Sequence, residues 1–286
     1  MRTVDFETIL AQSLQLTGLD RNNVTEQSFE QIKDFANNRL RFAWEYDVWP
    51  DLIRITRFPV VHQDTMHYIV IPDDGIVVNT EGTFKVNIGH IMQVTVEDPR
   101  AKGKVKEIGF SFDEYDEPVP NGDGTVYRTV KRIIVDNTGN SELFVTYRLE
   151  CPNLDGKLWA TGSPFYPDQI AYWAYQNNSY FAPTNSSLYK NLKGNFWKCI
   201  STTSNPPNHS GNVLPTLGDN WEKVKIPMIF GQYIIKGIHA DWLKSEMQIE
   251  FGKAMDADAQ NLLDSEIHKA IVQQGIQPRM KFNRIY

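Results

Sequence analysis

The first fifty residues carry two runs of hydrophobic positions with helical spacing. Apolar side chains recur at largely helical intervals over residues 4–17, and Gly18 follows as a stop signal. Thr25 suits the N-cap of a second helix, which we expect to end before Pro50. The apolar stripe of this helix consists of Phe29, Ile32, Phe35, Ala36, Leu40, Ala43 and Trp44. The aromatic-rich residues 44–52 are interpreted as a core corner where helix gives way to strand.

From residue 53 to about residue 150 the pattern changes to the two-residue alternation of half-buried strands. Turn signals rich in Gly, Asp and Asn separate the runs at 72–75, 121–124 and 137–139. The predicted strands are Ile53–Phe58, His67–Ile71, Gly82–Ile88, Ile91–Val96, Arg132–Val135 and Leu143–Tyr147. We therefore expect a β-rich insert, either a sandwich or a small barrel.

Helical spacing returns towards the C-terminus. Pro164–Gln169 is predicted to start a third helix, whose buried face would be Ile170, Trp173, Ala174 and Tyr175. A long helical pattern then runs from Pro227 to Gln274. As one unbroken helix it would be about 70 Å long, more than an ordinary domain accommodates. We therefore expect two helices or a projecting one, with the interruption at the glycines Gly231, Gly237 or Gly252.

These patterns predict an α+β protein with one helical bundle built from both ends of the chain. The bundle would comprise residues 1–52, 164–182 and 227–274. A β-rich domain resembling a sandwich or barrel, residues 53–163, would be inserted into it. Residues 185–226 would form a small aromatic module of β-strands and loops, and residues 275–286 an extended C-terminal tail.

Composition and charge narrow the classes of function. Hydrophobic residues make up 41% and charged residues 22% of the 286 residues, which is ordinary for a globular protein. The net charge of −6 argues against a general nucleic-acid binder but is compatible with a channel through which DNA slides. No apolar h-region opens the chain and no apolar run approaches the length of a membrane span, so we expect neither a secretory signal nor a membrane segment.

The sequence offers little that predicts catalysis or metal binding. It contains no P-loop, dinucleotide-binding, nucleophile-elbow or His-Glu-x-x-His motif. His62 and His67 flank Asp64, but their spacing matches no standard zinc pattern, and we interpret the stretch as a turn before a strand. The acidic stretch Asp113–Glu117 is expected to be a solvated loop, because its spacing does not match an EF-hand calcium loop.

The positions of the cysteines and of two aspartates likewise give no prediction of a catalytic or metal site. The two cysteines, Cys151 and Cys199, are far apart and lack a Cys-x-x-Cys partner, which predicts neither a disulfide framework nor a zinc site and fits a reducing compartment. Cys199 could act as a nucleophile only beside a spatially close histidine, and a packed strand is the favoured interpretation. Asp256 and Asp258 lie two residues apart on a predicted helix and would therefore face different directions. We predict no catalytic, cofactor-binding or metal-binding residue.

Two stretches resemble a known protein family. Residues 37–52, Asn-Asn-Arg-Leu-Arg-Phe-Ala-Trp-Glu-Tyr-Asp-Val-Trp-Pro-Asp-Leu, resemble a helix end of tailed-phage virion proteins. Residues 194–200, 221–227 and 240–243, with the Gln273-Gln274-Gly275 ending, resemble the C-terminal half of the same group, the head-to-tail connector or adaptor proteins. The match covers both ends of the chain and is weak over the β insert, and its motifs are structural.

The resemblance implies a virion structural protein, not an enzyme, that forms a ring of commonly twelve subunits between the portal protein and the next tail component. The ring would extend the channel through which the genomic DNA passes, and it would be assembled in the bacterial host cytoplasm. Residues 275–286 would grip the portal. The charged and apolar anchors of this tail would be Arg279, Lys281, Phe282, Arg284, Ile285 and Tyr286.

A shorter likeness lies inside the first. The stretch from Tyr189 to Trp221 resembles a small chitin-binding-type β module, in which exposed tryptophans stack on sugars. Trp197 and Trp221 would be the candidates, although both could equally pack a mini-core or an interface, which is the interpretation we favour. A carbohydrate-binding tail protein is therefore the alternative function, and a hydrolase would require converging carboxylates that the sequence does not indicate.

Overall fold

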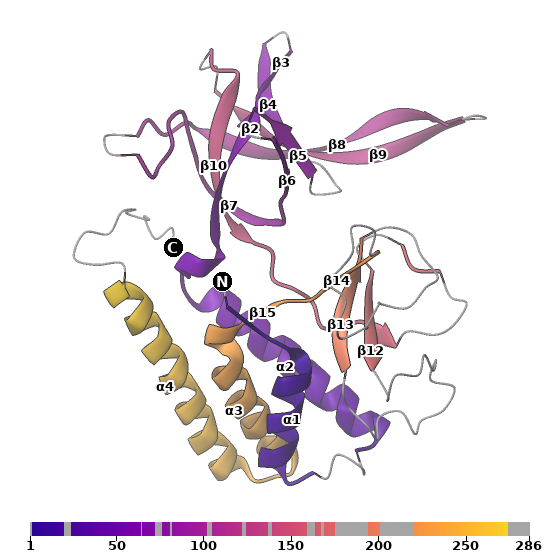
Figure 1. Cartoon of the computed structure of the whole chain (residues 1–286), viewed down its shortest axis with the longest axis vertical. Helices are drawn as coiled ribbons and strands as arrows, with labels where there is room; N and C mark the ends of the chain where they lie inside the picture. The colour runs from indigo at the N-terminus through magenta and orange to yellow at the C-terminus, as the bar shows by residue number, and fades with distance from the viewer. Residues whose placement is uncertain are drawn as a thin grey trace. The chain divides into compact units, whose positions relative to one another are not determined.

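The computed structural model describes most of the chain (Figure 1). The described residues are 2–19, 24–63, 65–71, 76–80, 82–101, 105–121, 124–136, 139–158, 164–166, 169–174, 194–200 and 220–273. Met1–Asp47 and Cys151–Val272 form one compact unit, and a second is built around Val48–Glu150. Within the described residues the chain combines four α-helices with several antiparallel sheets, which is the α+β class expected from the sequence.

The two N-terminal helices of the first unit begin and end where the sequence signals predict. Helix α1, Phe6–Thr17, stops at Gly18, which adopts a left-handed conformation with φ 72° and donates its N–H to the Leu14 carbonyl. Helix α2, Glu26–Tyr46, starts at Thr25, whose hydroxyl oxygen accepts a hydrogen bond from the Ser28 N–H. Most of their apolar residues are buried, whereas Phe35 is half-buried and Leu16 is exposed. The predictions for both helices are confirmed.

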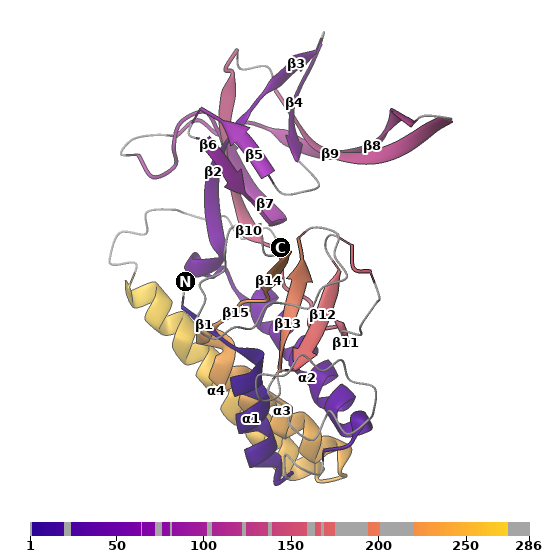
Figure 2. The same ribbon diagram turned by 45° about the vertical axis from the view of Figure 1, so that its right-hand side comes forward.

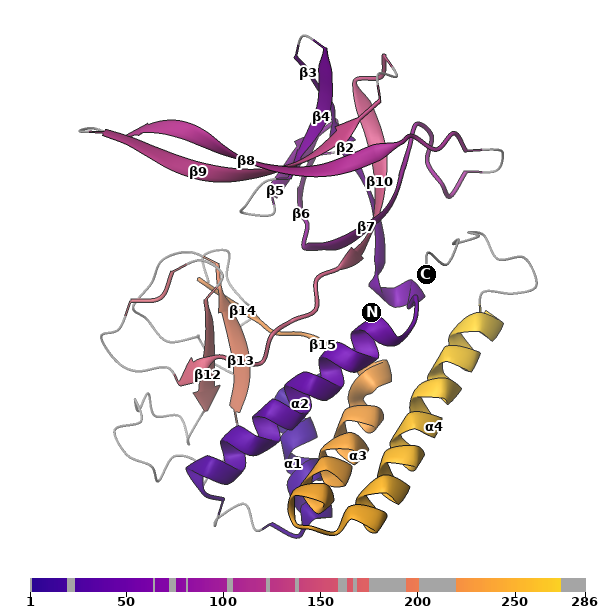
Figure 3. The same cartoon turned by 180° about the vertical axis from the view of Figure 1, so that it is seen from behind.

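The C-terminal helical region consists of two helices, as predicted, but the break lies elsewhere. Helix α3, Met228–Ser245, and helix α4, Ile249–Gln273, are separated at residues 246–248 (Figure 3). The three glycines expected to interrupt the region lie inside the helices. They allow close approach instead: a Cβ at Gly237 would lie 2.7 Å from Arg39 Cδ, and one at Gly252 would lie 2.6 Å from Lys244 Cγ. Placing the break at a glycine was therefore wrong.

The predicted third helix is wrong. Ile170–Ala174 is a strand, β12, in a four-stranded sheet ordered β11-β12-β13-β14 (Figure 2). Its residues pair antiparallel with β13, and β-branched and aromatic side chains suit such pairing better than a helix. The other strands are β11 Lys157–Leu158, β13 Gly194–Cys199 and β14 Trp221–Lys223, and β1 Thr3–Val4 pairs with β15 Ile226–Pro227. Tyr175 and the rest of the predicted segment, to 182, lie outside the described residues.

The sheet of the first unit is joined to its helices through aromatic rings. Phe6 on α1 makes edge contacts with Phe196 on β13, at 4.8 Å between ring centroids, and with Tyr172 on β12, at 6.2 Å. On the other side of the unit, Trp44 of α2 packs against Phe230 of α3 at 6.0 Å. These contacts bring the N-terminal helices together with elements far along the chain.

The second unit contains only strands and one short 3-10 helix, η1 Pro50–Leu52, among its described residues. A three-stranded sheet has the order β2-β10-β7, a four-stranded sheet has the order β3-β4-β9-β8, and β5 pairs with β6. One hydrophobic core includes residues from both sheets and the hairpin, among them Phe58, Ile69 and Val77. The strands are β2 Ile53–Pro59, β3 Val61–Gln63, β4 Met66–Ile71, β5 Ile76–Asn79, β6 Gly82–Lys85, β7 Ile88–Thr95, β8 Phe110–Asn121, β9 Gly124–Val135 and β10 Glu142–Leu149.

The expectation of a loop at Asp113–Glu117 is wrong, because these residues belong to β8. β8 and β9 pair along their full length, up to Asn121 opposite Gly124. Cross-strand partners neutralise two of the acidic side chains: Asp113 lies 2.6 Å from Arg132, and Glu114 lies 3.5 Å from Lys131. Paired charges are compatible with a strand, and alternation of hydrophobicity alone does not reveal them.

Candidate functional site

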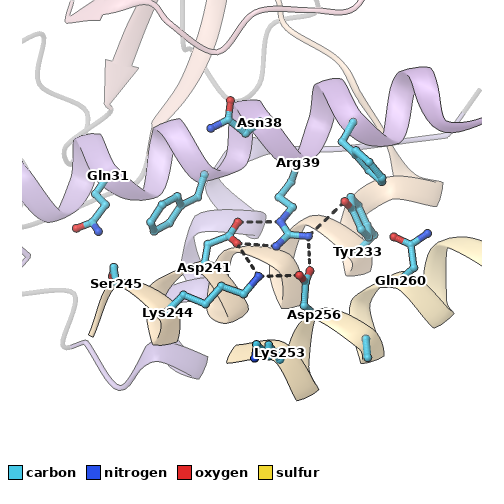
Figure 4. Close-up of a pocket in the computed structure, with 13 residues that line it drawn as sticks. Gln31, Asn38, Arg39, Tyr233, Asp241, Lys244, Ser245, Lys253, Asp256 and Gln260 are labelled. Atoms are coloured by element: carbon cyan, nitrogen blue, oxygen red, sulfur yellow. Dashed lines mark hydrogen bonds and ion pairs between the residues drawn. The ribbon is translucent and has the colours of Figure 1, made fainter. Parts of the chain in front are cut away.

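A hollow of about 940 Å³ lies between α2, α3 and α4 of the first unit (Figure 4). Charged side chains from all three helices meet inside it, beside the aromatic rings of Phe35, Phe42 and Tyr233. The other lining residues are Gln31, Asn38, Arg39, Asp241, Lys244, Ser245, Lys253, Asp256, Ala257 and Gln260.

Arg39 of α2 is the centre of this hollow. Its side chain is only 13% exposed. Nε and Nη2 donate to the two carboxylate oxygens of Asp241 on α3, at 2.8 and 2.6 Å, which is a bidentate pair. Nη1 donates to Asp256 Oδ1 on α4 at 2.6 Å and to the Tyr233 hydroxyl at 3.4 Å. One guanidinium therefore ties three helices together.

Lys244 completes the charge balance. Its Nζ donates to Asp256 Oδ2 at 2.6 Å and lies 3.7 Å from Asp241 Oδ1. Two cations and two carboxylates thus form a closed cluster, which we call the Arg39 cluster: Arg39, Asp241, Lys244 and Asp256. Because the cluster contains equal numbers of positive and negative charges, it is electrically neutral without a further ligand.

The surroundings keep Arg39 and Asp256 ionised. Burial alone would lower the pKa of Arg39, but its hydrogen bonds to Asp241, Tyr233 and Asp256 outweigh burial and raise that pKa. Burial alone would raise the pKa of Asp256, but hydrogen bonds from Lys244 and Arg39 hold it below its ordinary value. A carboxylate held charged in this way is a weak base, so the geometry suits the joining of helices better than proton transfer.

Helix α4 is attached mainly by polar contacts. Besides Asp256, its Asp264 accepts a hydrogen bond from the Tyr46 hydroxyl of α2 at 2.9 Å, and its Asp258 lies 3.7 Å from Lys236 of α3. Asp256 and Asp258 have different partners, in keeping with the prediction that they face different directions. Among α4 side chains that the structure describes, only three residues are buried: Gly252, Ala259 and Leu263.

The corner between α3 and α4 has an unusual residue at its turn. The Met247 N–H donates to the Lys244 carbonyl and the Gln248 N–H to the Leu243 carbonyl, which is the Schellman pattern of a helix end. The left-handed position of this motif normally holds glycine, yet here Met247 occupies it with φ 61°. This conformation costs an L-residue roughly 1–2 kcal/mol. The Met247 side chain is 87% exposed, and Phe251 nearby is 71% exposed.

Neither candidate sugar-binding tryptophan presents a fully exposed ring. Trp221 on β14 is 6% exposed and packs edge-on against Phe165, with 5.1 Å between ring centroids. Trp197 on β13 is half-buried against the same core, and the Lys223 ammonium lies over its ring at 5.6 Å. Stacking on a sugar requires an accessible ring face, so this packing does not favour the carbohydrate-binding alternative.

The predicted portal-gripping residues Arg279, Lys281, Phe282, Arg284, Ile285 and Tyr286 lie outside the described residues. Where α4 ends, at Gln273, the description of the chain also ends. The prediction for this tail stays a prediction.

The cysteines and the histidine pair, considered above as catalytic or metal-binding candidates, lie in or beside β-strands. Cys199 is buried in β13, as the packed-strand interpretation expects, and no disulfide joins it to Cys151. His62 and His67 are cross-strand partners whose Nδ1 atoms lie 2.7 Å apart, while Asp64 is not among the described residues. Within the described ranges no group of three or more His, Cys, Asp or Glu side chains could hold a metal ion. No helix in those ranges has the length and apolar character needed to span a bilayer.

Sequence reasoning missed the Arg39 cluster. Its members come from α2, α3 and α4, and about two hundred residues separate Arg39 from its carboxylate partners. A single sequence gives no signal for a contact at that separation. Comparisons of the chain with models of known protein families and with curated proteins find no match.

Proposed function

We propose that this protein is a head-to-tail adaptor of a tailed-phage virion, which forms a ring between the portal and the next tail component. In this proposal the helices of the first unit act as a bundle, and the second unit is an inserted β-sandwich or barrel. The observation that carries the proposal is α4, a 25-residue helix that runs up to the basic C-terminal tail and leaves most of its surface exposed. A helix of this kind can serve neighbouring subunits and deliver the tail to a partner.

The proposed role is assembly instead of chemistry. A closed ring needs two different, complementary faces on each subunit, and a side-by-side arrangement of long helices provides them. Contacts of the tail with the portal would have to outweigh the entropy cost of fixing its conformation, and repetition around the ring would compensate for a modest affinity at each site. The net charge of −6 would discourage DNA from adhering to the channel.

The decisive experiment is the particle mass, by mass photometry, of the protein alone and mixed with the portal protein of the same phage. We expect portal particles to gain about twelve copies of this chain, a symmetric closed ring. A variant lacking residues 275–286 should remain folded by circular dichroism and fail to join the portal. Portal particles whose mass does not change on mixing with the full chain would contradict the proposal.

A further inference from the structure

The corner between α3 and α4 lacks the sequence signals that normally separate two helices. Glu246, Met247 and Gln248 are all strong helix formers, with no glycine or proline among them. Met247 stands where a helix end prefers glycine, and Gln248 stands at the position before α4 where Ser, Thr, Asp or Asn is preferred. In contrast, α1 ends on Gly18 and α2 begins on Thr25. Local preference at this corner therefore favours a continuous helix.

A continuous helix would also gather the exposed apolar side chains of the corner. Leu243, Met247 and Phe251 are four residues apart, so in one straight helix they would lie on a single face. In the folded-back arrangement Met247 and Phe251 are among the most exposed hydrophobic residues that the structure describes. Straightening would turn them into a stripe that a neighbouring molecule could cover.

The α2–α3 surface that α4 would leave is complementary to α4 in charge and shape. Arg39 and Lys244 face Asp256, and Lys236 faces Asp258. The Tyr46 hydroxyl faces Asp264, and Gly252 has a close-packed site beside Ala240. A second copy of the chain carries the identical α4. Every contact that breaks within one copy can therefore form again between two copies, as in a domain swap.

We propose that residues 246–248 are a hinge, and that on assembly α4 swings out and occupies the α2–α3 surface of a neighbouring copy. Straightened, residues 228–273 would make one helix of about 70 Å. The exchange would pass from each copy to the next around a ring and would link the subunits without a new binding site. This inference rests on the proposed ring function, but its test does not require the portal.

The test uses cross-linking of a residue pair that spans α2 and α4. In the full chain, with Cys151→Ser and Cys199→Ala, Tyr46→Cys and Asp264→Cys would replace two side chains in direct contact. A short bifunctional maleimide then joins them within one chain if α4 is folded back, or between chains if it is exchanged. Denaturing gels separate the two products, because only exchange produces covalent dimers and larger species.

Two substitutions at Met247 shift the equilibrium between folded-back and exchanged α4 in opposite directions. Met247→Gly favours the folded-back corner, because glycine accepts the left-handed conformation and weakens a continuous helix. Met247→Ile disfavours it, because a β-branched residue at positive φ is strained. At high protein concentration we expect covalent multimers to increase from the glycine variant to the wild type to the isoleucine variant, at least tenfold between the extremes.

The outcomes are distinct. Multimer fractions that agree within twofold across the three proteins, or intrachain products alone in all of them, would overturn the exchange. Should portal-bound rings form and yield only cross-linked monomers, the ring function would stand and the exchange would fail. If portal particles gained no mass but the hinge series behaved as expected, the exchange would stand and the adaptor function would fail.

Discussion

Helices α3 and α4 follow one another in sequence and line the same hollow, yet they are held in different ways. Helix α3 buries large apolar side chains against α1 and α2, including Phe230, Tyr233 and Ile234. Of the α4 residues whose burial the structure describes, only two small residues and one leucine are buried, and three aspartates of α4 contact α2 or α3. Apolar burial responds little to salt, whereas charge contacts weaken as salt rises. We therefore expect α3 to unfold only with the whole unit and α4 to open separately.

The largest expected loss of stability comes from a substitution in the buried face of α3. Phe230→Ala removes a fully buried ring and should lower the free energy of unfolding by about 3–5 kcal/mol. Urea unfolding followed by tryptophan fluorescence measures it. Met228→Ala, on the same helix but with a side chain 56% exposed, is the control and should change stability by less than about 0.5 kcal/mol. Equal losses in both variants would contradict the burial described for α3.

Arg39→Met should have the second-largest effect on stability. It leaves Asp241 and Asp256 to share Lys244 as the one remaining cation of the Arg39 cluster. The excess partly buried negative charge is destabilising by about 2–4 kcal/mol at this degree of exposure. Hydrogen exchange should show α4 opening far more than α3. Arg41→Met, on the exposed side of the same helix, should have little effect. If protection of α4 survived Arg39→Met, the Arg39 cluster would not be what holds that helix.

Acid should act on α4 through Asp256. Since the folded-state pKa of Asp256 lies below its ordinary value of 3.8, its stabilising contribution is present above that pH and is lost as the pH falls through the folded-state pKa. Asp256→Asn should weaken α4 by about 1 kcal/mol at neutral pH and reduce the acid sensitivity of α4 exchange. Asp258→Asn, beside the more distant Lys236, is the matched control. Identical pH profiles for wild type and Asp256→Asn would reject this assignment.

The smallest effect is expected from Tyr46→Phe. It deletes the hydroxyl that donates to Asp264, one exposed hydrogen bond, and should weaken the C-terminal half of α4 by about 0.5–1 kcal/mol. Hydrogen exchange of residues 260–270 measures this change. Tyr166→Phe, on an exposed ring in the same unit, should leave those residues unchanged. Faster exchange along the whole of α3 would show instead that Tyr46 supports the core.

The sequence predicted those parts of the fold whose signals are local. Thr25 and Gly18 mark helix ends because their side chain or backbone satisfies groups a few residues away. Alternate residues of β10, Leu143, Val145 and Tyr147, lie in one buried core, as a two-residue alternation predicts. The prediction for Ile170–Ala174 was wrong because a short apolar run fits either period, and pairing with β13 decides that it is a strand.

The candidate site was not predictable in the same way. The Arg39 cluster depends on which carboxylates a distant helix brings alongside, and the helix break depends on α4 folding back over α2 and α3. At Met247 the local preference and the final structure disagree outright. Such disagreement is expected at strained or functional positions.

The interrupted first unit has a consequence for how the chain is made. Helices α1 and α2 leave the ribosome early, but α3, which covers their apolar stripes, follows only after the whole second unit has been translated. At typical elongation rates of about 5–20 residues per second, the nascent N-terminal helices wait roughly 10–40 s for that cover. During this interval the apolar stripes of α1 and α2, which α3 later covers, are available to chaperones or to other nascent chains. Polysome crowding should therefore limit the yield of this protein more than its final stability does.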